Sequence, residues 1–279
     1  KFEKVKFENS GLSILDKLDA LVTEAKNKGG AQHCDEQSLI NINLKWLGLF
    51  HREKYMPGYF MWRLRCPNGY FTIKQWKAIL EIMNDIDYKN HNDINNLWKQ
   101  EKCISLTTRQ NVQLFGIHFE NIHKYINILD NAGINYVQSG MDNVRNIVGN
   151  PIAGIDNEEL IDTRKYCDEF TNKLTNYGKG NPEFTNLPRK FNVCFVGSKE
   201  MYEHPHINDI AYLPAKNNLG ELGWKIEVGG LLTSTLCEFA IPLNIWVPLD
   251  KYWEIGEAIL TTYRDYGYRY NPRTKCRLM

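Results

Sequence analysis

A short stretch about two-thirds of the way along the chain combines a cation, an amide and an aromatic side chain. Residues 186–192 read NLPRKFN. Pro188 fixes its own backbone and favours an extended conformation before it, so a strand is predicted to follow. Alternation along that strand would set Lys190 beside Asn192 and opposite Phe191. A cation next to an amide on a polar face is the arrangement of a small-anion site, provided that further cations point there.

Arginines elsewhere in the chain could supply those cations. Residues 59–66 alternate like a half-exposed strand, which places Arg63 and Arg65 on its polar face. Arg109 lies in a polar link between two apolar runs, and Arg145 lies in the polar run 140–146. Because an arginine on a polar strand face is usually a solvated surface group, the pattern alone is weak support for a role of Arg63. We expect Arg65 to be a surface group or to lie behind the site.

The composition excludes several classes of function. The chain has 279 residues, of which 43% are hydrophobic and 24% charged, as in ordinary globular proteins with one large domain or two modest ones. The net charge is +1, so no strong field favours nucleic acid or an anionic membrane. No apolar run could span a bilayer and no signal-type segment opens the chain. The start at Lys1 predicts a processed or truncated N-terminus.

The cysteines do not form a recognisable ligand set. Their odd number and wide spacing argue against a disulfide framework and against a local zinc or iron–sulfur site, and favour buried reduced thiols in an intracellular protein. His204 and His206 lie beside Glu203, but no third ligand follows at a convincing spacing, so we expect a loop there. The seven cysteines are Cys34, Cys66, Cys103, Cys167, Cys194, Cys237 and Cys276.

Periodicity and turn signals predict an α+β chain. The order of elements in the first half, strand, helix, strand, strand and helix, suggests a ferredoxin-like half-domain. The Asn-rich segment 89–97 is predicted to be an exposed loop. Helices are predicted over 10–28, from 73 to about 83 with Thr72 as N-cap, and over 120–131, 158–174 and 252–263. Strands are predicted over 59–66, 103–107, 112–117, 191–197, 207–213 and 222–231, and a basic tail holds Arg269, Arg273, Lys275 and Arg277.

A series of motifs resembles one family. In chain order the motifs are LKWLG at 44–48, the strand and turn 60–69, TTRQN at 107–111, DNVRN at 142–146, GNPIAGID at 149–156, GNPEFTNLPRKFN at 180–192, IND at 207–209 and VGG at 228–230. Each motif alone is weak, but their order is specific. The series resembles the assimilatory nitrite and sulfite reductases, and most closely the ferredoxin-dependent nitrite reductases of cyanobacteria and plastids, from about residue 2 onwards.

The resemblance implies a fold, cofactors and a reaction. Members of this family use sirohaem coupled to a [4Fe–4S] cluster to reduce nitrite to ammonia with six electrons from ferredoxin. They are built as two related halves, and the cluster cysteines lie in the second half, so no metal ligand is expected in this chain. The implied organisation is an N-terminal helical extension (1–40), a ferredoxin-like half-domain (41–135) and a mixed-sheet α+β domain that contacts sirohaem (136–279), without the second half.

The resemblance also assigns roles to individual residues. Sirohaem carries many carboxylates and nitrite is an anion, so such a pocket needs fixed cations, preferably arginine, whose planar fork matches a carboxylate. Lys190 or Arg145 would relay protons through ordered water. The residues implied to hold the substrate are Arg63, Arg145, Lys190 and Asn192. The residues implied to bind sirohaem are Arg109, Gln113, Asn146 and Arg189.

Asn192 favours nitrite over sulfite. Sulfite reductases resemble this stretch but carry a second lysine at that position, which suits a more highly charged anion. A single lysine beside a neutral amide suits singly charged nitrite, because one charge at close range matters greatly in a poorly solvated pocket. A sulfite reductase, or a non-catalytic tetrapyrrole- or anion-binding module that lacks the cluster half, remains the alternative.

The family resemblance sets the remaining expectations. The implied partners are nitrite and ferredoxin, with no nucleic acid and no membrane insertion. A monomer is expected for the full-length protein. The expected compartment is the plastid stroma, or the cytoplasm if the source is a cyanobacterium.

Overall fold

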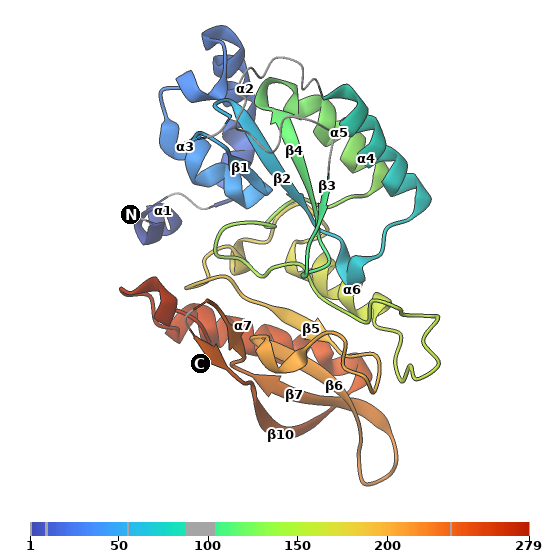
Figure 1. Cartoon of the computed structure of the whole chain (residues 1–279). Coiled ribbons are helices and arrows are strands. Elements are labelled where there is room, and N and C mark those ends of the chain that lie inside the picture. The colour runs from blue at the N-terminus through green and yellow to red at the C-terminus, as the bar shows by residue number, and fades with distance from the viewer. Residues whose placement is uncertain (1, 9–10, 55, 87–103, 235, 279) are drawn as a thin grey trace. The chain divides into compact units, whose positions relative to one another are not determined.

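The chain forms two compact units, each with its own α+β core. The computed structural model describes residues 2–8, 11–54, 56–86, 104–234 and 236–278 (Figure 1). The first unit comprises Lys1–Cys66 and Phe71–Met141, and the second comprises Pro67–Tyr70 and Asp142–Met279. The predicted Asn-rich loop at 89–97 lies outside the described residues.

The first unit is built on an antiparallel sheet with strand order β1-β2-β4-β3. Helices α4 and α5 pack on each other beside this sheet (Figure 1). The core contains Trp62 and Leu114 from the sheet, Ile82 from α4 and Leu18 from α2, so the N-terminal helices share it. The strands are β1 (Leu49–His51), β2 (Tyr59–Leu64), β3 (Ile104–Leu106) and β4 (Val112–His118), and the helices are α1 (Phe2–Glu8), α2 (Ser13–Lys28), α3 (Gln37–Asn41), α4 (Ile73–Asp85) and α5 (Ile122–Ala132).

A capping box starts α4 where the sequence predicts the helix. The Thr72 hydroxyl accepts a hydrogen bond from the Gln75 backbone N–H at 3.3 Å, and the Gln75 side-chain oxygen accepts one from the Thr72 N–H at 2.8 Å. These bonds satisfy two N–H groups that the helix itself cannot pair. The predicted N-cap is therefore confirmed.

Loss of this cap should destabilise the first unit modestly. We expect Thr72→Ala to lower the free energy of unfolding by about 1 kcal/mol, because it removes the oxygen that accepts the Gln75 N–H. Urea unfolding followed by circular dichroism measures the effect. Thr72→Ser retains a hydroxyl and should stay close to the wild type; an equal loss in both variants would argue against the capping bond as the cause.

Arg65 was predicted to be a surface group or to lie behind the site, and its burial excludes the surface alternative. Its side chain is buried, with the residue only 1% exposed, because β2 ends at Leu64 and the alternation of the strand no longer applies. Its Nε donates to the carbonyl of Val137 at 2.9 Å, and its Nη2 donates to that of Gln138 at 2.6 Å. Burial, followed by the nearby Arg63, lowers the pKa of Arg65 to about 9. Arg65 thus holds the segment that leads out of the first unit.

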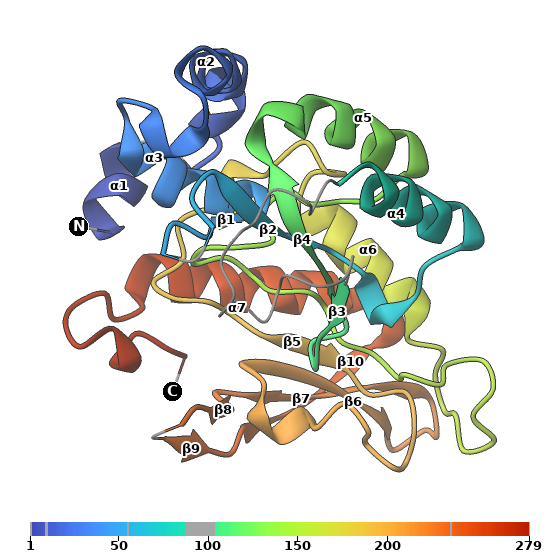
Figure 2. The same cartoon turned by 45° about the horizontal axis from the view of Figure 1, so that its top comes forward.

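The second unit is built on a mixed sheet with strand order β10-β7-β6-β5, which can be followed in Figure 1 and is seen from another direction in Figure 2. Strand β5 runs parallel to β6, and the other neighbours are antiparallel. Aromatic rings fill its core; Phe195 stacks on Tyr212 with 4.3 Å between ring centroids. The strands are β5 (Val193–Phe195), β6 (Ile210–Lys216), β7 (Leu222–Val228), β8 (Leu231–Leu232), β9 (Cys237–Glu238) and β10 (Ile241–Pro248), and the helices are α6 (Arg164–Leu174) and α7 (Tyr252–Tyr266). The predicted α+β fold class is confirmed.

The helix predicted over 158–174 begins only at Arg164, which corrects the sequence prediction. The preceding backbone is used elsewhere, because the Gly197 carbonyl accepts N–H bonds from Leu160 at 2.8 Å and Ile161 at 3.2 Å. The Asp162 carboxylate then accepts the Arg164 N–H at 3.0 Å. A side chain that bonds a nearby backbone N–H in this way favours a turn over a helix interior.

Three strand predictions for the second unit also need correction. The strand predicted over 191–197 is regular only over Val193–Phe195. The strand predicted over 207–213 begins at Ile210, since Pro205–Ile207 form a short 3₁₀ turn, and the strand predicted to reach residue 231 ends at Val228. Strand β10 was not predicted.

Candidate functional site

A single backbone pairing places three of the predicted site residues together in the second unit. Val144 and Phe191 form an isolated parallel bridge, in which the Arg145 N–H donates to the Phe191 carbonyl at 2.8 Å. Both bridged side chains are buried, at 1% and 0% exposure. Their neighbours Arg145, Lys190 and Asn192 therefore project from the opposite side of the pairing. Lys190 and Asn192 are both half-buried.

Lys190 lies in cationic surroundings. Burial lowers the pKa of its ammonium to about 8, helped by repulsion from Arg145, Arg277 and Arg189 and opposed by Asp209. Within the described ranges, no residue forms a hydrogen bond or an ion pair with this ammonium. An anion that can approach this ammonium would strongly stabilise its charged form, because burial and the neighbouring cations destabilise that form.

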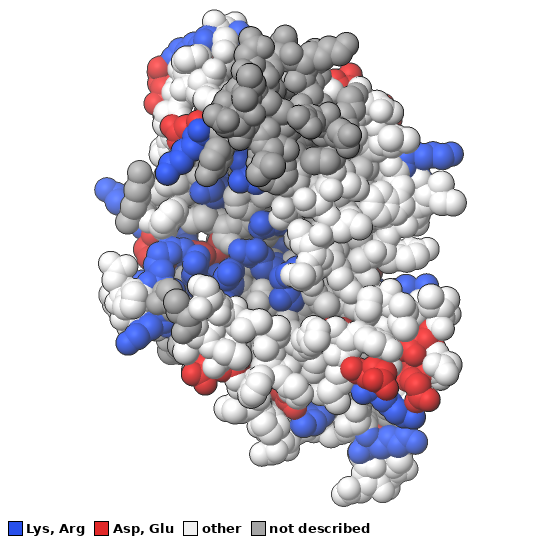
Figure 3. Space-filling model, viewed as in Figure 1, with Lys and Arg blue, Asp and Glu red and all other residues white. Residues whose placement is uncertain are grey.

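The acidic side chains near Lys190 already form ion pairs with arginines. Asp142 is 1% exposed and accepts bonds from Arg189 at 3.2 Å and Arg273 at 2.6 Å. Asp209 is fully buried and accepts the Nε of Arg277 at 3.1 Å. Figure 3 shows Lys and Arg gathered on one face, with little acidic surface among them. We call Arg145, Arg189, Lys190, Arg273 and Arg277 the cationic cluster.

A second arginine site lies on the sheet of the first unit. Arg63 of β2 is paired in register with Gln113 of β4, so the two side chains lie side by side on one face. The Arg63 guanidinium lies 4.6 Å from the ring centre of Phe50 and is 3.5 Å from the Ser139 carbonyl. Burial, followed by repulsion from Arg52, lowers its pKa to about 10. Its buried Nε has no hydrogen-bond partner among the described residues.

The remaining predicted residues occupy different settings. Arg109 lies at the tip of the β3–β4 hairpin, where Thr107 and Asn111 close the turn through side-chain and backbone bonds of 2.6 and 3.1 Å. Asn146 is 2% exposed, and its amide donates to the Ile147 carbonyl at 3.5 Å, at the limit for a hydrogen bond. Asn146 therefore belongs to the interior of the second unit.

The contribution of the C-terminal tail to the cationic cluster was not predicted from the sequence. Arg269, Arg273 and Arg277 bind the Asn186 carbonyl, the Asp142 carboxylate and the Asp209 carboxylate, respectively. Their spacing of four residues in a basic tail was the available signal. The buried acidic partners carry no such signal in the sequence.

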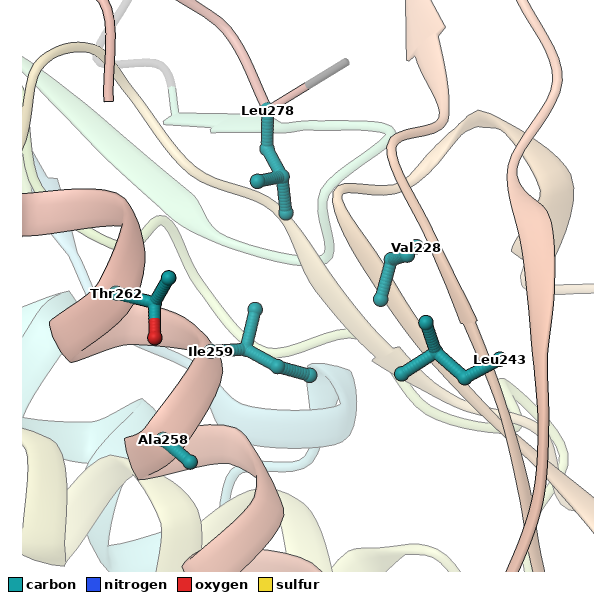
Figure 4. Close-up of a pocket in the computed structure, with 6 residues that line it drawn as sticks. All are labelled: Val228, Leu243, Ala258, Ile259, Thr262 and Leu278. Carbon is teal, nitrogen blue, oxygen red and sulfur yellow. The ribbon is translucent and has the colours of Figure 1, made fainter. Parts of the chain in front are cut away.

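An apolar pocket of about 230 Å³ lies in the second unit (Figure 4). Its lining offers one hydroxyl, from Thr262, and otherwise hydrocarbon, so it cannot compensate the charge of an anion. In the described part of the chain, no three His, Cys, Asp or Glu side chains gather into a metal-ion site. The lining residues are Val228, Leu243, Ala258, Ile259, Thr262 and Leu278.

Comparisons with known proteins match both units. Residues 51–132 match the family described as "Nitrite/Sulfite reductase ferredoxin-like half domain". Residues 140–279 match the family described as "Nitrite and sulphite reductase 4Fe-4S domain". A chloroplastic ferredoxin–nitrite reductase of Arabidopsis thaliana is 43% identical over 99% of this chain and 45% of the relative. A ferredoxin–nitrite reductase of Synechococcus elongatus is 42% identical over 100% of this chain and 51% of the relative.

Solved structures share the fold. The NirA protein of Mycobacterium tuberculosis superposes with a TM-score of 0.81 at 26% identity, covering 99% of this chain and 49% of NirA. Dissimilatory sulfite reductase I superposes with a TM-score of 0.59 at 12% identity, which indicates a shared fold alone. The chain spans about half the length of the curated relatives it matches. No helix in the described ranges is long and apolar enough to cross a membrane.

Proposed function

Because the chain belongs to the nitrite and sulfite reductase family, we propose that it is part of a ferredoxin-dependent nitrite reductase, which reduces nitrite to ammonia with six electrons. The observation that carries the proposal is Lys190, a half-buried ammonium within a cluster of arginines whose neighbouring carboxylates are already engaged. Such a cluster attracts a small anion and can stabilise negative charge that develops on it.

The residues present fit a sirohaem, which carries several carboxylates. In the second unit, the single carboxylate of Asp142 is shared by the guanidinium groups of Arg189 and Arg273, so guanidinium groups outnumber the carboxylates there. Guanidinium groups are the donors that the carboxylates of such a ligand require. The family resemblance assigns the carboxylates of sirohaem to Arg109, Gln113 and Arg189, and Asn146 to the binding of the same group. When bound, sirohaem coupled to a [4Fe–4S] cluster would supply the iron that binds nitrite and pass on the electrons from the donor.

The chain's own residues would bind nitrite and supply protons. Arg145 and the Lys190 ammonium would hold the nitrite oxygens, and Lys190 would donate a proton from Nζ as an N–O bond breaks. Arg63 is assigned to the substrate by the family resemblance. Asn192 adds hydrogen bonding without charge, which suits a singly charged anion better than sulfite.

The rate should depend on the charge of Lys190. An ammonium is charged below its pKa and neutral above it, so kcat/KM for nitrite should fall as the pH rises through about 8. Lys190→Arg keeps its charge well above that pH and should lose this fall. Steady-state kinetics of both proteins between about pH 6.5 and 9.5 measure the difference; the same alkaline fall in both would assign it to another group.

The proposed electron donor is ferredoxin. The Arabidopsis relative is named as chloroplastic, and another relative comes from the cyanobacterium Synechococcus elongatus. We therefore propose the plastid stroma as the compartment, with the cyanobacterial cytoplasm as the alternative, and a monomer as the full-length state.

An absorption spectrum of the purified full-length protein tests the proposal. We expect sirohaem bands, and nitrite loss when reduced methyl viologen is supplied. Sirohaem bands without loss of nitrite or sulfite would instead indicate a binding module, and sulfite consumption in preference to nitrite would indicate a sulfite reductase.

A further inference from the structure

A buried ion pair lies directly behind the proposed nitrite site. Arg277 is 6% exposed and Asp209 is fully buried. The Nε of Arg277 donates to Oδ1 of Asp209 at 3.1 Å, and its Nη2 donates to Oδ2 at 2.5 Å. This two-bond fork fixes the orientation of both side chains, which a lysine at position 277 could not do.

Asp209 in turn fixes the backbone of the segment that carries Lys190 and Asn192. Its Oδ2 also accepts the backbone N–H of Asn192 at 2.8 Å. The next peptide completes the link, because the Ile210 N–H donates to the Asn192 carbonyl at 3.1 Å. The Asp209 carbonyl is itself held by the Gly229 N–H at 3.0 Å. The position of Asn192, and of Lys190 two residues before it, therefore depends on where Asp209 lies.

The tail that carries Arg277 is anchored on both sides of this residue. On one side, the Tyr263 hydroxyl of α7 donates to the Cys276 carbonyl. On the other, Leu278 packs against the hydrophobic core of the second unit and lines the apolar pocket together with Ile259 of α7 and Val228 of β7 (Figure 4). These contacts bring Arg277 to Asp209 as a fixed group.

We propose that Arg277 is a positioning residue for nitrite reduction: through Asp209 it holds the Lys190–Asn192 segment in the geometry that binds the anion. The inference rests on the proposed function. Arg277 donates its bonds to Asp209 and acts on the substrate through this partner.

The pair also acts on the charge of Lys190. The charged groups that face this ammonium are Arg145, Arg189 and Arg277, which lower its pKa, and Asp209, which raises it. Removal of Arg277 takes away one repulsion and leaves Asp209 uncompensated. Both changes raise the pKa of Lys190, so the alkaline fall in kcat/KM should move to higher pH.

The test compares full-length, sirohaem-loaded variants. Arg277→Gln should lower kcat/KM for nitrite by about 10- to 100-fold near neutral pH. Its alkaline fall should move to higher pH, and sirohaem content should stay unchanged. Arg269→Gln is the matched control: it removes a guanidinium of the same tail, which binds Asn186, and it should leave the pH profile unchanged. An unmoved profile in Arg277→Gln, or an equal loss in Arg269→Gln, would overturn the inference.

A second measurement does not depend on activity. Amide hydrogen exchange, followed by mass spectrometry on a peptide covering 189–195, should speed up at least about tenfold in Arg277→Gln and stay unchanged in Arg269→Gln. Arg277→Gln leaves the buried Asp209 carboxylate without its partner, which could itself destabilise the fold. The double variant Asp209→Asn with Arg277→Gln removes this unpaired charge and should show the same faster exchange of the 189–195 peptide. Unchanged exchange in both would overturn the positioning role. Faster exchange in a protein whose wild type consumes no nitrite would instead refute the proposed function.

Discussion

Replacement of Lys190 with alanine is expected to lower kcat/KM for nitrite by about 10²- to 10³-fold, while sirohaem content remains at the wild-type level. The loss follows because Lys190 combines half-burial with a lowered pKa, as expected of a group that meets an anion and yields a proton. Nitrite consumption with reduced methyl viologen, normalised to bound sirohaem, measures it.

Lys199 provides the matched control for this substitution. Its side chain is 64% exposed and pairs with Glu158 at 2.6 Å, in the same unit as Lys190. Lys199→Ala should leave both turnover and sirohaem content unchanged, because exposed pairs contribute little. If Lys190→Ala lost turnover and sirohaem in equal measure, Lys190 would be a cofactor-binding or structural residue.

Replacement of Asn192 with lysine is expected to move preference from nitrite towards sulfite. A unit charge at about 4 Å is worth about 4 kcal/mol at an effective dielectric constant of about 20, and desolvation of the new side chain offsets part of this. We therefore expect the ratio of kcat/KM for sulfite to that for nitrite to rise by about 10- to 100-fold. The hydrogen bond from the Asn192 backbone N–H to the Asp209 carboxylate does not involve the Asn192 side chain, so it should persist in this variant.

The opposite charge at the same position checks the electrostatic explanation. Asn192→Asp introduces a carboxylate of similar size, so it should weaken the use of both anions. If Asn192→Lys and Asn192→Asp changed the sulfite-to-nitrite ratio equally and in the same direction, side-chain shape rather than charge would determine the preference.

Elements with local signals were predictable from the sequence. The apolar repeat of α7 and the Thr72 cap of α4 depend only on residues a few positions apart. The predicted bounds of these two helices are therefore close to the observed ones. Where the local pattern competes with distant partners, prediction failed. The 158–163 segment bonds Gly197 instead of continuing a helix, and Arg65 turns inward to the carbonyls of Val137 and Gln138.

The candidate site was only partly predictable for the same reason. Alternation around Phe191 correctly separates Lys190 and Asn192 from a buried ring, but the bridge to Val144 that brings Arg145 beside them spans 47 residues of sequence. The tail contact from Arg273 to Asp142 joins residues 131 positions apart. No periodic pattern encodes such pairings, and the family resemblance was needed to associate the arginines with one function.

The most direct measurement of the central claim is the yield of ammonia from nitrite in the full-length, sirohaem-loaded protein with reduced methyl viologen as donor. The proposed six-electron reaction predicts one ammonium for each nitrite consumed, and a higher kcat/KM for nitrite than for sulfite. Nitrite loss without ammonium, or a higher kcat/KM for sulfite, would contradict it.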